Sequence, residues 1–308
     1  MEYDAKCAAR HYGPWMLELG WLQARLWEME HGVFKPMAGT AVDGTSEMSQ
    51  PQDGLLTLQI INQMMKGESK YGGTNTLQLR KQVREARRDE DVKGVFLLVD
   101  SPGGTAAGTA ELADDVRALA AEKPTHAYIW DLGASAAYWV ASQANRISAN
   151  EAGMVGSIGT MAAIVDSSGA AEAEGIKVHV LSTGPYKATG VPGAPISEEQ
   201  ISYLQERVDD MNELFLRAVS NGRLVSMDQV EQWASGKIWR ADKAKELGLI
   251  DSVSTMEDAA QRLRESIPAD APTKRETMRL RMKMQVLALD LAIRRCSNQG
   301  VFQGRAEA

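Results

Sequence analysis

The chain has 308 residues, of which 44% are hydrophobic and 24% are charged, and this composition allows a sizeable core to form. Its formal net charge of -7 argues against nucleic acid as the main partner, because phosphate binding requires a basic surface. Two cysteines, Cys7 and Cys296, form neither a disulfide framework nor a zinc cluster, and they fit a reducing compartment. The first residues carry acidic side chains, and no apolar run approaches the length of a membrane span. We therefore expect a cytoplasmic protein without a membrane anchor.

The N-terminal residues 1–37 are rich in tryptophan and predict a helical extension. Apolar residues recur there at helical spacing along one stripe, namely Trp15, Leu19, Leu22, Leu26 and Met29. Two interpretations stay open, a helix packed on the main domain and a docking helix for a partner chain. Residues 38–54 are small, polar and turn-rich, and they predict a linker.

The main domain is predicted for residues 55–267, where strands alternate with helices. The expected strands are 55–61, 94–100, 126–130, 146–149, 161–166 and 177–182. A charged helix is expected at 77–88, and two later helices begin at Ser197 and Ser226. Each of these serines has a glutamine three residues later, as in a capping box. The alternation predicts an α/β fold with a largely parallel sheet. Residues 268–308 predict a linker and a C-terminal helix over 275–296.

A first candidate site segment is the turn Asp100-Ser101-Pro102-Gly103-Gly104, which directly follows a predicted strand. Glycines at such a turn let the backbone approach a ligand and present N–H groups to it. A developing oxyanion needs donors of this kind, held in place in advance. The simpler interpretation is an ordinary strand-to-helix junction.

A second candidate is Ser135, which follows Gly133-Ala134 after an apolar strand and precedes two alanines. Small neighbours allow a nucleophile to sit at a tight strand-to-helix turn with its hydroxyl accessible. The N–H of Ala136 is expected at the first turn of the following helix, where an anion is favoured. The alternative is a serine that only caps that helix.

A third candidate is Lys187, in a loop bounded by Gly184, Pro185 and Gly190. Most lysines are solvated surface groups. A serine hydroxyl becomes a good nucleophile only when a base removes its proton, and a neutral lysine, a state that burial favours, is able to do so. No His/Cys/Asp cluster shows metal-ligand spacing, so neither a metal nor another cofactor is expected.

Histidine is a less suitable base in this chain. His11 and His31 belong to the N-terminal extension, and His126 and His179 fall within predicted strands. No histidine stands in a loop near the Ser135 turn, so a Ser-His-Asp arrangement is poorly supported.

Taken together, these segments resemble the signal peptide peptidase A family of serine peptidases over roughly residues 55–255. The segments that resemble the family's motifs, in the family's order and spacing, are 100–104, 134–138, 147–160, 183–200 and 234–251.

The resemblance implies a ClpP/crotonase-like fold, a spiral of β-β-α units, here with N- and C-terminal helical extensions. It implies Ser135 as nucleophile and Lys187 as general base, with Gly103 or Gly104 and Ala136 as oxyanion donors. Ser157 and Ser182 are candidates for orienting the lysine. Family members form rings or domes in which a neighbouring protomer helps to complete the active site, so a homo-oligomer is expected.

The missing membrane anchor, the tryptophan-rich start and the stretch 70–86 look more like the phage branch of the family, the prohead or capsid-assembly proteases. This branch implies scaffold and capsid proteins as substrates, in the infected cell or within the prohead. A bacterial cytoplasmic peptidase acting on peptides would look the same. Two further alternatives are a crotonase-like acyl-CoA enzyme without a serine nucleophile and a capsid-assembly protein with a vestigial site.

Overall fold

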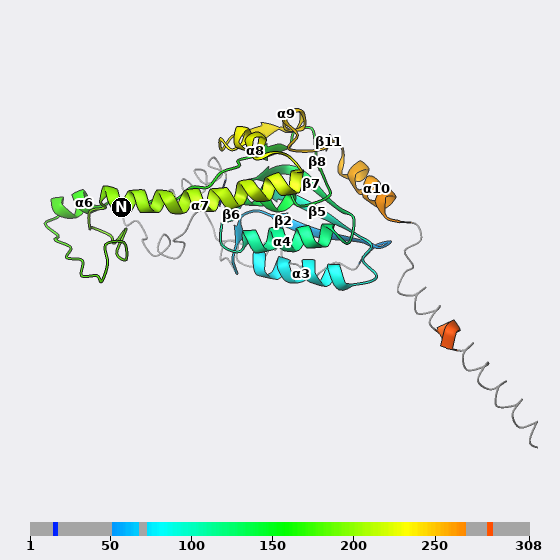
Figure 1. Ribbon diagram of the computed structural model, residues 1–308, viewed down its shortest axis with the longest axis horizontal. Helices are drawn as coiled ribbons and strands as arrows, with labels where there is room; N and C mark the ends of the chain where they lie inside the picture. Colours follow the sequence, from blue (N-terminus) through cyan, green and yellow to red (C-terminus); the bar gives the residue numbers. More distant parts are fainter. Residues whose placement is uncertain (1–14, 18–50, 68–72, 269–281, 286–308) are drawn as a thin grey trace, which may run out of the picture.

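A computed structural model describes residues 15–17, 51–67, 73–268 and 282–285 (Figure 1). Its main sheet has seven strands, in which β10, β9, β7, β5 and β2 follow one another and β8 joins β7 to β11. All neighbouring strands are parallel except β9 and β10. The bounds are β2 Leu55–Ile61, β5 Gly94–Ser101, β7 Thr125–Ala134, β8 Arg146–Ala149, β9 Met154–Gly156, β10 Ile238–Arg240 and β11 Ser252–Val253. The expected parallel α/β sheet is therefore confirmed.

A smaller sheet holds four short strands in the order β1, β6, β3 and β4. Their bounds are β1 Trp15–Leu17, β3 Met64–Met65, β4 Thr74–Asn75 and β6 Gly103–Thr105. Two long central strands, β2 and β5, are each followed by short strands of this sheet and then by a helix, which is a β-β-α unit. One unit is β2, β3/β4 and α3 (Thr76–Arg88), and the next is β5, β6 and α4 (Thr109–Ala120). The expected repeat of β-β-α units is confirmed at these two places.

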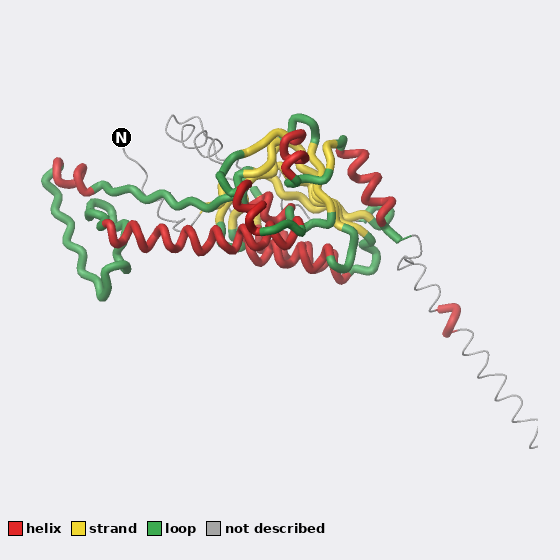
Figure 2. The backbone as a smooth tube through the Cα atoms, turned by 45° about the horizontal axis from the view of Figure 1, so that its top comes forward, coloured by secondary structure: helices red, strands yellow, loops and turns green. Residues whose placement is uncertain are grey.

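Helices cover both faces of the main sheet, as Figure 2 shows. The central strand β5 is buried along nearly its whole length, as expected for a parallel strand between two helical layers. Its Val95, Leu97 and Val99 belong to the larger core cluster, whereas Phe96 and Leu98 face a smaller cluster under α10 (Met256–Ser266). The larger core also takes residues from α5 (Ala136–Ala141), α7 (Glu198–Arg223), α8 (Met227–Trp233) and α9 (Ala241–Leu247).

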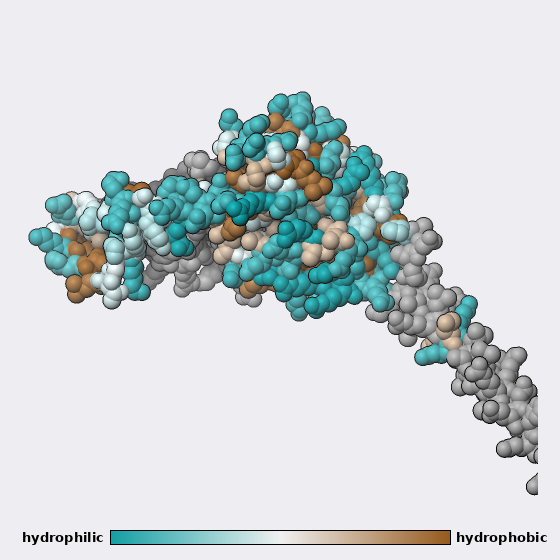
Figure 3. All heavy atoms as spheres, in the orientation of Figure 1, coloured by the Kyte–Doolittle hydropathy of each residue, from teal (hydrophilic) through white to brown (hydrophobic). Residues whose placement is uncertain are grey.

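The chain between β9 and the second half of α7 projects from the body as an arm (Figure 1). It contains the short helix α6 (Ser168–Ala173) and the N-terminal part of the 26-residue α7, whose buried residues are confined to its C-terminal half. The capping box at Ser197 is confirmed. Figure 3 shows hydrophobic residues gathered at the far end of the arm. Its large exposed apolar side chains are Ile164, Val165, Ile176, Val180, Leu181, Tyr186 and Ile201.

The prediction of strands at 161–166 and 177–182 is wrong for the chain as described. Apart from a single bridge residue, Met161, both segments are irregular, and they are largely exposed, with Val165 at 73% and Leu181 at 97% of full exposure. A strand needs a neighbouring strand for its backbone N–H and C=O groups, and neither segment pairs with another strand of the described chain. An apolar alternating pattern alone does not provide that partner.

The expected N-terminal helix is contradicted at residues 15–17, which form strand β1 against β6. The open hydrogen-bonding edge of β6 outweighs a helical hydrophobic pattern there, because pairing satisfies backbone groups of both strands. The rest of residues 1–37, most of the linker 38–54 and most of 268–308 lie outside the described residues. Residues 282–285 of the expected C-terminal helix are helical. None of the described helices has the length and hydrophobicity needed to cross a bilayer.

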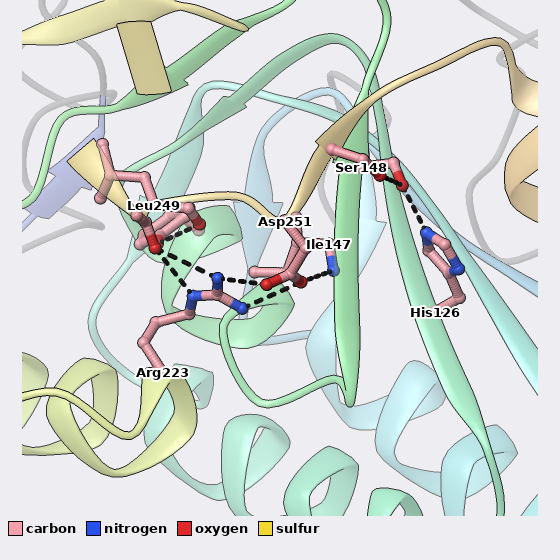
Figure 4. A network of polar contacts seen from close by, with 9 residues as sticks. His126, Ile147, Ser148, Arg223, Leu249 and Asp251 are labelled. Carbon is pink, nitrogen blue, oxygen red and sulfur yellow. Dashed lines mark hydrogen bonds and ion pairs between the residues drawn. The ribbon is translucent and has the colours of Figure 1, made fainter. Parts of the chain in front are cut away.

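A polar network ties the C-terminal end of α7 to the helix that begins after Ser135 (Figure 4). Arg223 donates to Asp251 at 2.7 Å and to the Gly248 carbonyl at 3.1 Å. The Tyr138 hydroxyl of α5 donates to the Leu249 carbonyl at 2.7 Å. Burial by itself raises the pKa of Asp251, but the bond from Arg223 outweighs it and the pKa lies below its usual value.

We predict that Arg223→Met lowers the free energy of unfolding by about 2–4 kcal/mol, because it leaves the partly buried Asp251 carboxylate without its cation. Chemical denaturation measures the change. Arg240→Met is the matched control, since the Arg240–Asp242 ion pair is exposed on both sides. Equal denaturation curves for the two variants would contradict the structural role of Arg223.

Candidate active site

The parallel register of three strands gathers the sequence-predicted site segments at one edge of the sheet. Ser101 at the end of β5 pairs with Gly133 of β7, and Ala134 pairs with Gly156 of β9. The residues that directly follow these three strands must therefore lie side by side. They are the Gly-Gly segment, Ser135 and Ser157.

Ser135 occupies the single residue between β7 and α5, in a strained backbone conformation. Its φ is 54° and its ψ is -122°, a region that a residue with a side chain rarely adopts. Its N–H donates to the Gly156 carbonyl at 2.8 Å, which attaches the turn to β9. Strain of this kind, typically about 1–3 kcal/mol, persists where the surrounding structure over-determines it, and it is concentrated at functional sites.

The Ser135 hydroxyl is buried and has no hydrogen-bond partner among the described residues. Ser135 stands at the N-cap position of α5, but its hydroxyl makes no capping hydrogen bond, which argues against a simple helix-capping serine. A buried hydroxyl left without a partner costs about 1–3 kcal/mol. Within the described residues, the hydroxyl is therefore free to interact with a group that approaches it from outside them.

The surroundings of Ser135 are built from small residues. Ala134, Ala136 and Ala137 are fully buried, so the residues beside Ser135 in the chain pack closely into the core. Ala136 is the first residue of α5, and the N–H groups of a first helical turn have no partner within the helix. This N–H is available to an anionic oxygen near Ser135.

The Gly-Gly segment lies in β6, against which α5 packs. Gly103 has a φ of 95°, in the left-handed region that favours glycine. A Cβ on Gly104 would lie 1.8 Å from the Met64 carbonyl oxygen, so only glycine fits beside β3. The structure therefore brings Gly103 and Gly104 together with Ser135 and Ala136.

Sequence reasoning missed how Asp100 and Ser101 hold this turn. Ser101 is fully buried, and its Oγ donates to the Asn62 carbonyl at 2.5 Å and accepts the Gly103 N–H at 3.2 Å. The Asp100 carboxylate accepts the Leu132 N–H at 3.1 Å, close to the end of β7. Burial, and then the charge of Asp131, raises the pKa of Asp100. The only sequence signal was their place beside the glycines.

The two possible supporting serines separate in the structure. Ser157 is buried, has a φ of 50° and lies across from Ser135 at the end of β9. Its N–H donates to the Lys237 carbonyl at 2.7 Å. Ser182 is exposed in the arm, where its hydroxyl donates to the Gly184 carbonyl at 2.6 Å. Only Ser157 belongs to the cluster around Ser135.

Lys187 is also exposed in the arm, and the chain does not bring it to Ser135. Its neighbour Tyr186 packs on Tyr203 of α7 at a ring distance of 4.7 Å, whereas Trp139, one turn after Ser135, stacks on Phe215 at 4.9 Å. Tyr203 and Phe215 are about 18 Å apart along the helix axis, at the usual rise of about 1.5 Å per residue. Proton transfer needs a distance near 3 Å.

The described histidines have other places. His126 is buried at the start of β7, about 30 Å along the strand from Ser135 at the usual rise per residue. Its Nε2 lies 2.6 Å from the Ser148 Oγ, and burial lowers its pKa to about 4, so it is neutral at physiological pH. His179 is exposed in the arm. His11 and His31 lie outside the described residues.

A pocket of about 340 Å³ lies at the opposite end of β7, lined among others by Thr125, His126 and Arg262. It is far from the serine cluster and does not belong to the candidate active site. In the described part of the chain, no three His, Cys, Asp or Glu side chains gather as metal ligands.

Comparisons with known proteins show to which family the chain belongs. Residues 117–269 match the model of peptidase family S49, a stretch that includes Ser135 and Lys187. A putative protease of Methanocaldococcus jannaschii is 37% identical over 179 residues, covering 58% of each protein. A putative protease of Synechocystis sp. is 30% identical over 185 residues, covering 59% of this chain and 67% of that protein. The chain belongs to peptidase family S49.

Two further similarities complete the comparison. Capsid assembly protease C of Escherichia phage lambda is 28% identical over 248 residues, covering 80% of this chain and 52% of the phage protein. The chain thus spans a little over half the length of the archaeal and phage relatives. A solved member of the enoyl-CoA hydratase/isomerase family, a crotonase-like fold, aligns with 71% of this chain and 73% of its own, at 16% identity and a TM-score of 0.42.

We predict that Ser135→Ala leaves the protein as stable as wild type or more stable by about 1 kcal/mol, because it removes a buried hydroxyl that has no partner among the described residues. Ser142→Ala is the matched control, since that buried hydroxyl donates to the Trp139 carbonyl at 2.7 Å and its loss should cost about 1 kcal/mol. Urea unfolding of both variants measures the difference. A clear loss of stability in Ser135→Ala would show that the hydroxyl is satisfied in the folded protein.

Proposed function

We propose that this protein is a serine endopeptidase in which Ser135 is the nucleophile and Lys187 is the general base. The observation that carries the proposal is the buried, unpartnered Ser135 hydroxyl on a strained turn beside Gly103 and Gly104. Membership of peptidase family S49 supports it, because the matched region contains both proposed catalytic residues.

The reaction proceeds through an acyl-enzyme. The amine of Lys187 removes the proton from Ser135 as the hydroxyl attacks the peptide carbonyl, and it then gives a proton to the leaving amine. The N–H groups of Ala136 and of Gly103 or Gly104 hold the oxyanion. Water, deprotonated by the same lysine, hydrolyses the acyl-enzyme. Ser157 lies beside Ser135 and orients the incoming amine. Neither a metal nor another cofactor takes part.

A neighbouring protomer supplies the lysine in this proposal. The arm holds Lys187 far along α7 from Ser135 of its own chain, and it exposes apolar side chains such as Val165 and Leu181. Apolar surface of this kind commonly marks a protein–protein interface. In a homo-oligomer, the arm of one protomer would lie on the body of the next, burying these residues and the lysine and giving the segments 162–166 and 177–182, which pair with no strand of the described chain, strand partners.

The sharpest test mixes two inactive variants, Ser135→Ala and Lys187→Ala. If each site takes its serine and lysine from different protomers, random co-assembly restores about a quarter of the wild-type sites. We predict recovery of peptide hydrolysis near that level in co-expressed mixtures, measured on a fluorogenic peptide. A mixture that assembles but remains inactive would place both residues in one chain or refute the dyad.

Lys187→Arg tests the chemical role of the lysine within the same assay. A guanidinium stays protonated, so this variant should be nearly as inactive as Lys187→Ala. His126→Gln should retain the chemical step, because His126 is far from Ser135.

Labelling of Ser135 by a fluorophosphonate separates the peptidase from an acyl-CoA enzyme of the same fold or a non-catalytic assembly protein. Neither of these alternatives should be labelled.

Scaffold and capsid proteins of a phage are the proposed substrates. The similarity to capsid assembly protease C extends over 80% of this chain, against 58% for the archaeal protease. A cytoplasmic peptidase degrading short peptides is the alternative, which the identity of 37% with the archaeal protease supports.

We predict that co-expression with phage scaffold and capsid proteins yields defined fragments of those proteins by mass spectrometry. The same experiment with Ser135→Ala should yield none, because the acyl-enzyme route is lost. Intact scaffold and capsid proteins, together with rapid hydrolysis of short peptides, would favour the peptide-degrading alternative.

A further inference from the structure

The edge of the smaller sheet that is formed by β1 lies beside the candidate active site. Its order is β1, β6, β3 and β4, so β6 would be an edge strand if β1 were absent. β6 is the strand that contains Gly103 and Gly104, the proposed oxyanion donors. An open strand edge binds extended peptides through main-chain hydrogen bonds, a common mode of peptide recognition.

A segment of the chain's own N-terminal region occupies this position. β1 runs antiparallel to β6, with Trp15 opposite Thr105, Met16 opposite Gly104 and Leu17 opposite Gly103. The segment therefore pairs with the residues that a substrate backbone must approach. Two of the three partners are glycines, so the pairing depends on the main chain and not on side chains of β6.

The site is closed in this arrangement. Ser135 is only 1% exposed, and Gly103 and Gly104 are buried, although a nucleophile must reach a substrate carbonyl. We propose that residues 15–17 are a self-inhibiting segment, which occupies on β6 the strand position that an extended substrate peptide takes. The inference rests on the proposed peptidase function and adds to it a form of regulation.

The size of the contact makes exchange feasible. β1 pairs through three residues only, and a tethered segment competes with a free peptide at an effective concentration of roughly millimolar. A substrate that adds a longer strand to β6 displaces it. The protease then remains closed until a suitable extended chain is present at high local concentration.

The test disrupts the pairing of β1 with β6 and keeps the N-terminal segment in the chain. The double variant Met16→Pro/Leu17→Pro lacks two backbone N–H groups, so whichever of the two residues donates to β6, a ladder bond is lost. Met16→Ala/Leu17→Ala is the matched control, which truncates the same side chains but keeps both N–H groups. Both pairs of substitutions are placed in Ser135→Ala, so that binding is measured without hydrolysis.

The probe is a fluorescent synthetic peptide with the sequence of residues 13–19, and the readout is fluorescence anisotropy. We expect the proline variant to bind this peptide at least about tenfold more tightly than the alanine variant, because no tethered segment competes. A probe carrying the two prolines should not bind. Equal affinities in the two variants would overturn the inference, and thermal unfolding checks that both are folded.

A second measurement uses the chain with Ser135 intact. It tests docking on β6 even if the proline variant does not fold. The 13–19 peptide should inhibit hydrolysis of a fluorogenic substrate competitively, and its proline form should not. Absence of inhibition, in a chain that hydrolyses the substrate, would refute docking on β6. Tight probe binding in a chain without any hydrolysis would instead refute the peptidase function and leave the docking site standing.

Discussion

The parallel register of β5, β7 and β9 is the constraint on which the candidate site depends. Parallel strands end at the same edge, and the pairs Ser101–Gly133 and Ala134–Gly156 place the following residues next to each other. A shift of one residue would turn Ser135 to the other face of the sheet. The two-sided burial of β5 opposes such a shift, because its alternate residues fill two different cores.

The strained turn at Ser135 exists because its surroundings over-determine it. β7 and β9 hold it on one side through the bond from the Ser135 N–H to Gly156, and α5 continues directly on the other. α5 is in turn fixed by the stacking of Trp139 on Phe215 and by the bond from Tyr138 to the loop that Arg223 and Asp251 secure. These contacts stabilise the fold, and this stabilisation offsets the free-energy cost of the strained conformation and of the buried hydroxyl.

The arm has the opposite character. Its apolar side chains are exposed, its two strand-like segments have no strand partner in the described chain, and its lysine is distant from the serine. The body has a complete core, whereas the arm has an incomplete one. A second protomer packed against the arm would account for this difference. The self-pairing of β1 on β6 would add a level of control at the same edge.

The sequence by itself determined the α/β class, the main strands and helices of residues 55–267, and the candidate groups Ser135, Gly103, Gly104 and Ala136. These are local signals, since hydrophobic period, caps and turn glycines act over a few residues. Only the tertiary structure decided which groups meet. It joined Ser157 to Ser135, separated Ser182 and Lys187 from them, revealed the roles of Asp100 and Ser101, and made a strand of residues 15–17. Strand pairing and burial depend on partners distant in the chain, and a local pattern does not specify those partners.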